Sequence, residues 1–176
     1  MIFRPTKIGG AYAIEPERHA DERGSFARAW CTREFEAHGL SPSIVQASIS
    51  TNRKKGTLRG MHYSVPPHAE AKLVRCIKGA IYDVLLDLRR GSHTYLAWFA
   101  ETLTRENGVA LFVPEGVAHG FQTLEDESDV LYQMSEFYDP NCARGVRWND
   151  PAFAIRWPLE EPVLSERDRT YESFPS

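Results

Sequence analysis

Short stretches of alternating apolar and polar residues recur along most of the chain and predict β-strands. Gly, Pro, Asn and Asp, the residues typical of turns, separate these stretches from one another. The predicted strands cover residues 44–51, 57–63, 72–77, 80–88, 95–103, 109–113, 120–124 and 130–136. Short strands at regular spacing, with little helix between them, favour an antiparallel sandwich or barrel.

One helix is predicted early in the chain, within the segment CTREFEAHGL. Thr32 is its candidate N-cap, Phe35 and Leu40 are its apolar contacts, and Gly39 ends it. The carboxyl-terminal third is rich in Pro and Trp, and we expect it to wrap the barrel as ordered but irregular chain.

Length and charge limit the kinds of partner. The chain has 176 residues, which fits one domain over residues 1–176 with a buried core. Its formal net charge is −3, so we expect neither nucleic acid nor a membrane surface as a partner. No apolar run approaches the ~18 residues of a membrane helix, and the N-terminus lacks the pattern of a secretion signal.

The cysteines indicate a reducing compartment. Cys31, Cys76 and Cys142 are odd in number and have no CxxC spacing. They predict free thiols rather than a disulfide framework or a zinc site. We therefore expect a cytoplasmic protein.

Residues 58–63 place a histidine inside a strand pattern. Alternation puts His62 on one face with Leu58 and Gly60, and Arg59 on the other. If the first face points into a barrel, His62 is interior. An interior histidine is either a hydrogen-bonded structural residue or a general base, since histidine titrates near neutral pH.

Two further segments carry polar residues within apolar strands. Lys72 shares a face with Val74, and is either a solvated edge charge or a fixed cation beside a developing oxyanion. After a tight turn framed by Pro and Gly, His119 and Gly120 open another strand, where Gly120 allows close approach of a ligand or of backbone.

Metal and phosphate-loop chemistry lack a sequence signature. The six histidines form no H-x-H pair, and no Glu follows at a familiar ligand spacing, so we expect no metal site. His62, His68 and His119 could converge only through the fold. There is also no Gly-rich phosphate loop and no G-x-S-x-G elbow.

Many motifs in order match one known family. They are DERGSF at 21–26, GTLRGMHY at 56–63, KLVR at 72–75, DLR at 87–89, PEGVAHGF at 114–121, YQMSEFY at 132–138, WNDP at 148–151 and LSERD at 164–168. On these residues the chain resembles the dTDP-4-dehydrorhamnose 3,5-epimerases, from about residue 20 to 168. The resemblance implies an all-β fold, a cupin-type jelly-roll barrel or sandwich with few short helices.

The resemblance also implies a reaction. It is epimerisation at C3, C5 or both of a nucleotide-linked 4-keto-6-deoxyhexose, first of all conversion of dTDP-4-dehydro-6-deoxy-D-glucose to dTDP-4-dehydro-L-rhamnose. His62 matches the base, Asp168 its partner carboxylate, Tyr132 the acid on the opposite face, and Lys72 the cation near O4. No cofactor or metal is implied. Without the resemblance, Asp168 reads as a surface charge and Tyr132 as a core aromatic residue.

Substrate contacts are implied in the same way. Arg23 and Arg59 match contacts to the diphosphate, for which a guanidinium fork is well suited, although each could equally form a structural ion pair. Phe26 matches a residue that stacks near the nucleobase, and His119 matches another substrate contact. Family members are typically homodimers, often with the N-terminal strand crossing to the partner, and we expect a homodimer here.

Three positions depart from the family pattern. Arg28 stands where a Glu is common near the nucleobase, so it either points away or shifts the preference toward CDP, because Arg can donate to N3 and O2 of cytosine. Gln46 is retained, but Ser48 replaces the usual Asn, which shortens or removes a ligand contact. Ser64 replaces a Gln, at a position that we expect to border the pocket.

Three alternatives remain open. One is a single-centre 3- or 5-epimerase that acts on a CDP-linked or other nucleotide-linked sugar. The second is a metal-dependent cupin oxygenase, against which the missing H-x-H argues. The third is a non-catalytic sugar-nucleotide-binding module, and retention of His62, Lys72, Tyr132 and Asp168 together argues against it.

Overall fold

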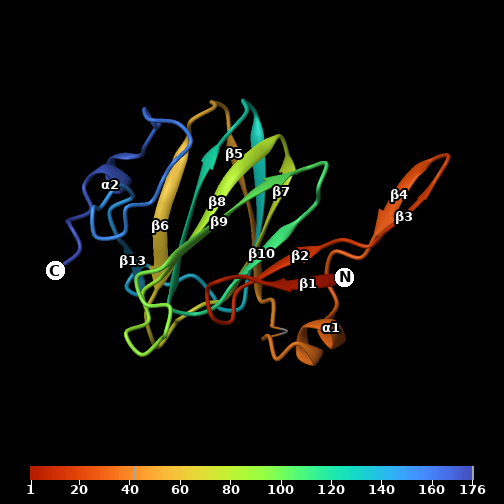
Figure 1. Ribbon diagram of the computed structural model, residues 1–176, viewed down its shortest axis with the longest axis horizontal. Helices are drawn as coiled ribbons and strands as arrows, with labels where there is room; N and C mark the ends of the chain where they lie inside the picture. The colour runs from red at the N-terminus through yellow and green to blue at the C-terminus, as the bar shows by residue number, and fades with distance from the viewer. Residues whose placement is uncertain (42, 176) are drawn as a thin grey trace.

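Two antiparallel β-sheets form the body of the protein, as seen in a computed structural model that describes residues 1–41 and 43–175 (Figure 1). The first sheet has the order β1 (Ile2–Pro5), β2 (Tyr12–Glu15), β10 (Ala110–Val113), β7 (Lys72–Lys78), β12 (Ser128–Met134) and β5 (Gln46–Asn52). The second has the order β13 (Ala143–Gly145), β6 (Leu58–Ser64), β11 (Val117–Thr123), β8 (Ala80–Asp87) and β9 (Trp98–Thr104). The all-β prediction is confirmed.

The main core lies between the two sheets. Alternate residues of strands from both sheets point inward, including Val74 and Leu111 from the first and Leu85 and Phe121 from the second. These side chains are fully buried. This packing keeps the two sheets in fixed positions, so residues projecting from facing strands can form a rigid site between them.

The outer faces of both sheets are also covered. Helix α1 (Thr32–Ala37) packs Phe35 against the outer face of the first sheet. Phe153 and Ile155 from the carboxyl-terminal third cover the second sheet. The expectation of a wrapping, irregular C-terminal third is confirmed, except that it also contains β13 and the short helix α2 (Glu166–Arg169). In the described residues, no helix has the length and apolarity that crossing a membrane requires.

All eight predicted strands are present, with shifts of a few residues at their ends. The predicted cap of α1 is wrong. Thr32 is the first residue of the helix, and the N-cap is Cys31, whose extended backbone (φ −157°, ψ 115°) precedes the first turn without a side-chain capping bond. Gly39 follows the helix in the left-handed region at φ +68°, as its role in ending the helix requires.

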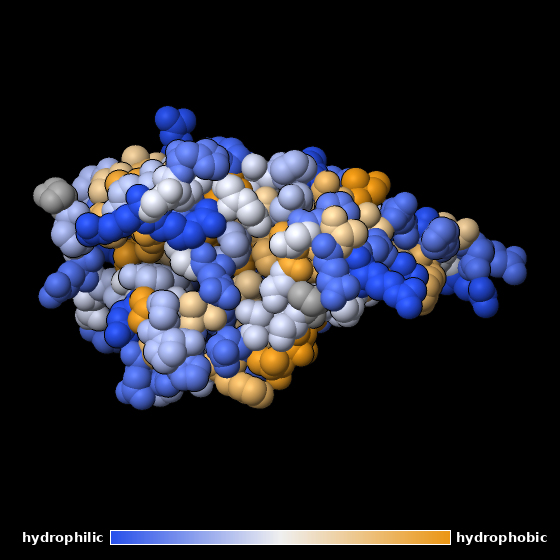
Figure 2. All heavy atoms as spheres, turned by 90° about the horizontal axis from the view of Figure 1, so that it is seen from below, coloured by the Kyte–Doolittle hydropathy of each residue, from blue (hydrophilic) through white to orange (hydrophobic). Residues whose placement is uncertain are grey.

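A two-stranded hairpin that was not predicted projects from the body. It consists of β3 (Arg18–Asp21) and β4 (Gly24–Ala27), and nearly all its residues are exposed. Figure 1 shows it reaching away from the two sheets, and in Figure 2 it forms the narrow end of the molecule. The Phe26 side chain is 76% exposed there, which is unusual for a large apolar residue in a lone hairpin.

Candidate active site

A cavity of about 520 Å³ between the sheets gathers most of the polar residues singled out from the sequence. Strands β5, β7 and β12 form one wall, β6 and β11 another, and the segment around α2 a third. The lining consists of Ser48, Ile49, Ser50, Arg59, His62, Lys72, His119, Tyr132, Tyr138, Ser165, Arg167 and Asp168. We call it the active-site cavity below.

An irregularity in β6 explains why Arg59 and His62 both face this cavity. His119 pairs with His62, and Phe121 pairs with Arg59. Between these two pairs, β6 advances by three residues and β11 by two. The extra residue is a bulge, which resets the alternation. The expectation that Arg59 and His62 lie on opposite faces was therefore wrong.

Two glycines allow the strands to meet at this bulge. A Cβ on Gly120 would lie 2.9 Å from the carbonyl oxygen of Arg59, and a Cβ on Gly60 would lie 2.6 Å from the Cα of Gly120. Neither distance can accommodate a side chain. The prediction that Gly120 allows close backbone approach is confirmed.

His62 forms a short hydrogen bond with a carboxylate. Its Nε2 lies 2.6 Å from Oδ1 of Asp168, the buried residue of α2. Burial acts to raise the pKa of Asp168, but the hydrogen bond and charge of His62 outweigh it, with help from Ser165, and the pKa is lowered. Asp168 is thus held as an anion behind the imidazole. The Oγ of Ser165 accepts the backbone N–H of Asp168 and caps the helix.

The Lys72 side chain projects from β7 into the active-site cavity and forms an ion pair with Glu70. Its Nζ lies 2.7 Å from Oε1 of Glu70, and each of the two side chains is 11% exposed. The Oγ of Ser64 donates to the same oxygen at 3.2 Å. Ser64 does not border the active-site cavity, contrary to expectation, because it lies at the end of β6 and lines a separate cavity. It is linked to the site through its hydrogen bond to Glu70.

Tyr132 faces the His62–Asp168 pair, called the dyad below, from the opposite sheet. It lies on β12, whereas His62 lies on β6. Burial raises the pKa of Tyr132 well above its ordinary value, and the charge of Asp83 adds to the effect. The phenol is therefore kept protonated over the physiological pH range, in the state that can give a proton.

His119 forms a second buried pair. Its Nε2 lies 2.6 Å from Oδ1 of Asp83, and its ring stands edge-on to that of Tyr132 with centroids 5.7 Å apart. Burial raises the pKa of Asp83. Within the described residues, the Oδ2 of Asp83 has no hydrogen-bond partner. Nothing in the sequence singles out Asp83, since it looks like any polar residue in an apolar strand.

Arg59 is oriented by a hydrogen bond to a buried neighbour. Its Nε donates to Oδ1 of Asn52 at 2.8 Å, and Asn52 is buried. Ser48 lines the active-site cavity as the resemblance implies, but Gln46 does not. The Oε1 of Gln46 accepts the backbone N–H of Tyr138, so it supports the loop that carries a cavity residue.

Five lining residues were not predicted from the sequence: Ile49, Ser50, Tyr138, Ser165 and Arg167. Tyr138, Ser165 and Arg167 fall inside the matched motifs YQMSEFY and LSERD, so their motifs were the available signal. Ser50 lies two positions after Ser48 on the same strand. Nothing in the sequence points to Ile49.

The residues of the hairpin region are not brought to this cavity. The guanidinium of Arg23 pairs with Asp21 at 2.6 Å, and that of Arg28 pairs with Glu34 at 2.6 Å. Neither arginine nor Phe26 lines the active-site cavity. Of the two alternatives for Arg28, the pairing with Glu34 favours a side chain that points away from the cavity of this chain.

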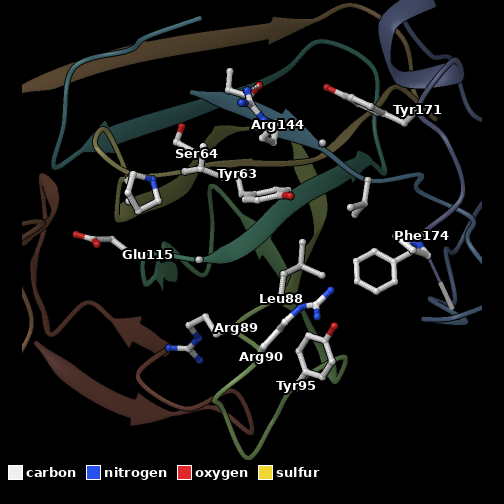
Figure 3. Close-up of a pocket in the computed structure, with 18 of the residues that line it drawn as sticks. Tyr63, Ser64, Leu88, Arg89, Arg90, Tyr95, Glu115, Arg144, Tyr171 and Phe174 are labelled. Carbon is white, nitrogen blue, oxygen red and sulfur yellow. Dashed lines mark hydrogen bonds between the residues drawn. The ribbon is translucent and has the colours of Figure 1, made fainter. Parts of the chain in front are cut away.

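A second, larger cavity of about 810 Å³ lies outside the second sheet (Figure 3). It is lined by Tyr63 and Ser64 of β6, by Arg90 and Tyr95 of the β8–β9 loop, and by tail residues 171–175. Its lining contains no histidine and no lysine. We call it the outer cavity. It lacks the paired acid and base of the smaller one.

The arrangement in the active-site cavity supports proton transfer. A histidine backed by a carboxylate lies on one wall, a protonated phenol on the other, and an ammonium group beside them. Among residues 1–41 and 43–175, no group of three or more His, Cys, Asp or Glu side chains is placed to hold a metal ion.

Comparison with known proteins gives a consistent answer. The family model described as dTDP-4-dehydrorhamnose 3,5-epimerase matches residues 5–176. A protein of that description from Shigella flexneri is 39% identical over 170 residues, 96% of this chain and 93% of its own length. A dTDP-4-dehydrorhamnose 3-epimerase from Streptomyces niveus is 40% identical over 170 residues, 96% of this chain and 82% of its own.

Solved structures agree with these relatives. The dTDP-4-dehydrorhamnose 3,5-epimerase of Elizabethkingia anophelis superposes with a TM-score of 0.96 at 36% identity, covering 99% of this chain and 96% of the other. An enzyme from Legionella pneumophila, solved in complex with dTDP-4-keto-L-rhamnose, gives 0.89 at 36% identity, covering 95% and 89%. Fold and relatives define a carbohydrate epimerase, an isomerase on a cupin-like barrel. The chain belongs to the dTDP-4-dehydrorhamnose 3,5-epimerase family.

Proposed function

We propose that this protein converts dTDP-4-dehydro-6-deoxy-D-glucose to dTDP-4-dehydro-L-rhamnose by inverting C3 and C5 without a cofactor. The observation that carries the proposal is the 2.6 Å hydrogen bond between His62 and Asp168, in a cavity whose opposite wall bears the protonated Tyr132. The substrate is supported by the names of the relatives and by the bound sugar nucleotide of the Legionella enzyme.

The chemistry follows from the ketone at C4. The hydrogens on C3 and C5 are acidic because the electron pair left by deprotonation delocalises onto the C4 oxygen. His62 removes the proton, and Asp168 stabilises the imidazolium that forms. Lys72 neutralises the developing oxyanion. Tyr132 then donates a proton to the carbon from the opposite face, so the stereocentre is inverted and the C4 ketone is restored.

Three more residues would bind the substrate. Arg59, held by Asn52, presents a fork that suits the diphosphate. His119, held by Asp83, offers a second contact near the sugar. Tyr138 is 56% exposed beside the cavity, where its ring can stack on a nucleobase.

We further propose a homodimer in which the β3–β4 hairpin reaches the partner's active-site cavity. The motif that contains Arg23 and Phe26 matches substrate contacts, yet neither residue lines the cavity of its own protomer, and Figure 1 shows the hairpin reaching away from the two sheets. A hairpin with an exposed aromatic residue is suited to such a crossing.

Mixing two inactive variants tests the crossing. One variant carries Phe26→Ala and Arg23→Ala, and the other carries His62→Ala. If the hairpin acts on the partner, random mixed dimers contain one intact site, and activity returns to about a quarter of the wild-type value. If each hairpin serves its own protomer, mixing restores nothing, and a monomer in light scattering would also refute the dimer.

A single-centre 3-epimerase is the second candidate, because a relative of that activity is as similar as the 3,5-epimerases are. The decisive experiment is proton NMR of the dTDP-linked 4-keto-6-deoxyglucose with the protein in D₂O, beside His62→Ala. Deuterium at both C3 and C5 supports the main proposal, and deuterium at C3 alone supports the second. If folded wild-type protein exchanges no deuterium, both proposed activities are wrong.

The nucleobase and the compartment complete the proposal. Arg28 is engaged by Glu34, which supports the dTDP form over the CDP form. Competition between the two sugar nucleotides in the same NMR assay tests this, and preference for CDP would contradict it. The free state of Cys31, Cys76 and Cys142 supports a cytoplasmic location.

A further inference from the structure

Tyr171 packs against the catalytic pair from outside the active-site cavity. It follows α2 by two residues, and its ring stands edge-on to that of His62 with centroids 6.0 Å apart. Its hydroxyl accepts a hydrogen bond from Nε of Arg167 at 2.8 Å. Arg167 immediately precedes Asp168, so Tyr171 contacts both His62 and the residue next to Asp168.

The ring of Tyr171 occupies a slot that exists only because residue 145 is a glycine. Gly145 of β13 lies directly opposite His62 in the strand register. A Cβ on Gly145 would lie 2.1 Å from Cζ of Tyr171. Gly145 has no positive φ, so its backbone would accept alanine. What forbids a side chain there is the tyrosine ring.

The chain on both sides of this ring is anchored to the body of the protein. Tyr171 lines the outer cavity, and Figure 3 shows it near α2 on the wall of that space. Further along the tail, the backbone N–H of Phe174 donates to Oδ2 of Asp150 at 2.6 Å, and its ring packs on Phe153. Before α2, Val163 bridges to Thr57. The chain is therefore anchored on both sides of α2, and Tyr171 is the anchor beside the dyad.

We propose that Tyr171, seated over Gly145, is a positioning residue that holds the His62–Asp168 pair in its reactive geometry. This inference rests on the proposed function. A base displaced by about 1 Å can lose ~10²-fold in rate, so loss of the ring lowers kcat by about 10- to 100-fold. Binding of dTDP changes little, since Tyr171 itself does not line the active-site cavity.

The test compares Tyr171→Ala, Tyr171→Phe and Gly145→Ala in the D₂O exchange assay, with dTDP affinity by calorimetry. Tyr171→Ala and Gly145→Ala should lower kcat with an unchanged Kd, and Tyr171→Phe, which keeps the ring, should retain most activity. The double variant Gly145→Ala/Tyr171→Ala should be no worse than Tyr171→Ala alone, because the added methyl group then has room.

A second cycle separates positioning from general stability. In the Asp168→Asn background, Tyr171→Ala should cost much less than in wild type, because the pair it positions is already lost. Tyr95→Ala is the matched control, since it removes a tyrosine from the same outer cavity away from His62, and it should leave kcat unchanged.

The outcomes are distinct. Unchanged kcat in Tyr171→Ala, fully multiplicative losses with Asp168→Asn, or an equal loss in Tyr95→Ala would each overturn the inference. Absence of exchange in the wild-type protein would instead overturn the proposed function.

Discussion

Replacement of Asp168 by Asn isolates the contribution of the carboxylate to catalysis. The substitution keeps the size and burial of the side chain but removes its charge. The bond that is weakened is a 2.6 Å contact between His62 and a carboxylate that is only 3% exposed. A hydrogen bond to a charged group contributes about 1.5–3 kcal/mol. Since about 1.4 kcal/mol corresponds to a tenfold change in rate, kcat/KM should fall by roughly 10- to 150-fold.

The assay is deuterium incorporation into the 4-keto sugar, measured at saturating and at low substrate. The loss should appear in kcat, while dTDP binds as in wild type, because Asp168 supports the base and not the nucleotide. Asp87→Asn is the matched control, a fully buried carboxylate that is paired with Arg89 rather than with His62. If Asp168→Asn keeps kcat/KM within about threefold of wild type, the reasoning about the dyad is wrong.

Three further predictions concern other parts of the molecule. Tyr132→Phe should still exchange deuterium at the carbon next to the ketone but should lose inversion by about 10²- to 10⁴-fold, and normal yields of epimer by NMR would contradict its role as the acid. Gly120→Ala places a methyl group against the bulge and should lower the free energy of unfolding by about 1–3 kcal/mol. Calorimetry should then find Tm lowered by ~2–12 °C, and an unchanged Tm would show that the strands can separate. Burial acts to raise the pKa of Asp87, but its hydrogen bonds, led by Arg89, outweigh burial and lower the pKa. The stability that Asp87 contributes is therefore present above its unfolded pKa of about 3.9 and is lost as the pH falls. Urea unfolding between pH 6 and 3 should therefore be less pH-dependent in Asp87→Asn, and an equal slope would refute this.

Strands with a strong alternating pattern were the part of the fold that sequence could predict. The strand around Lys72 behaved as expected: Val74 lies in the core and Lys72 faces the active-site cavity. The β3–β4 hairpin could not be found in this way, because its residues are exposed on both faces and carry no alternation.

The site could be predicted in part, and its failures have a physical cause. The bulge in β6 changed the faces of Arg59 and His62, and strand alternation assumes that no residue is inserted. Asp168 looks like a surface charge in the sequence, and only the fold brings it under His62. Asp83 and Glu70, which hold His119 and Lys72, could not be predicted at all, because a supporting partner is defined by tertiary contact.

The separation of 106 residues between His62 and Asp168 has a consequence for synthesis of the protein. Chains leave the ribosome from the N-terminus, and β1–β13 all precede α2. Both sheets can therefore assemble while the catalytic pair is still incomplete. The base, His62, gains its partner carboxylate only when the segment with Ser165 and Asp168 emerges and packs against β6. A nascent chain stalled before residue 165 would hold His62 without that carboxylate, so it should epimerise more slowly than the complete chain.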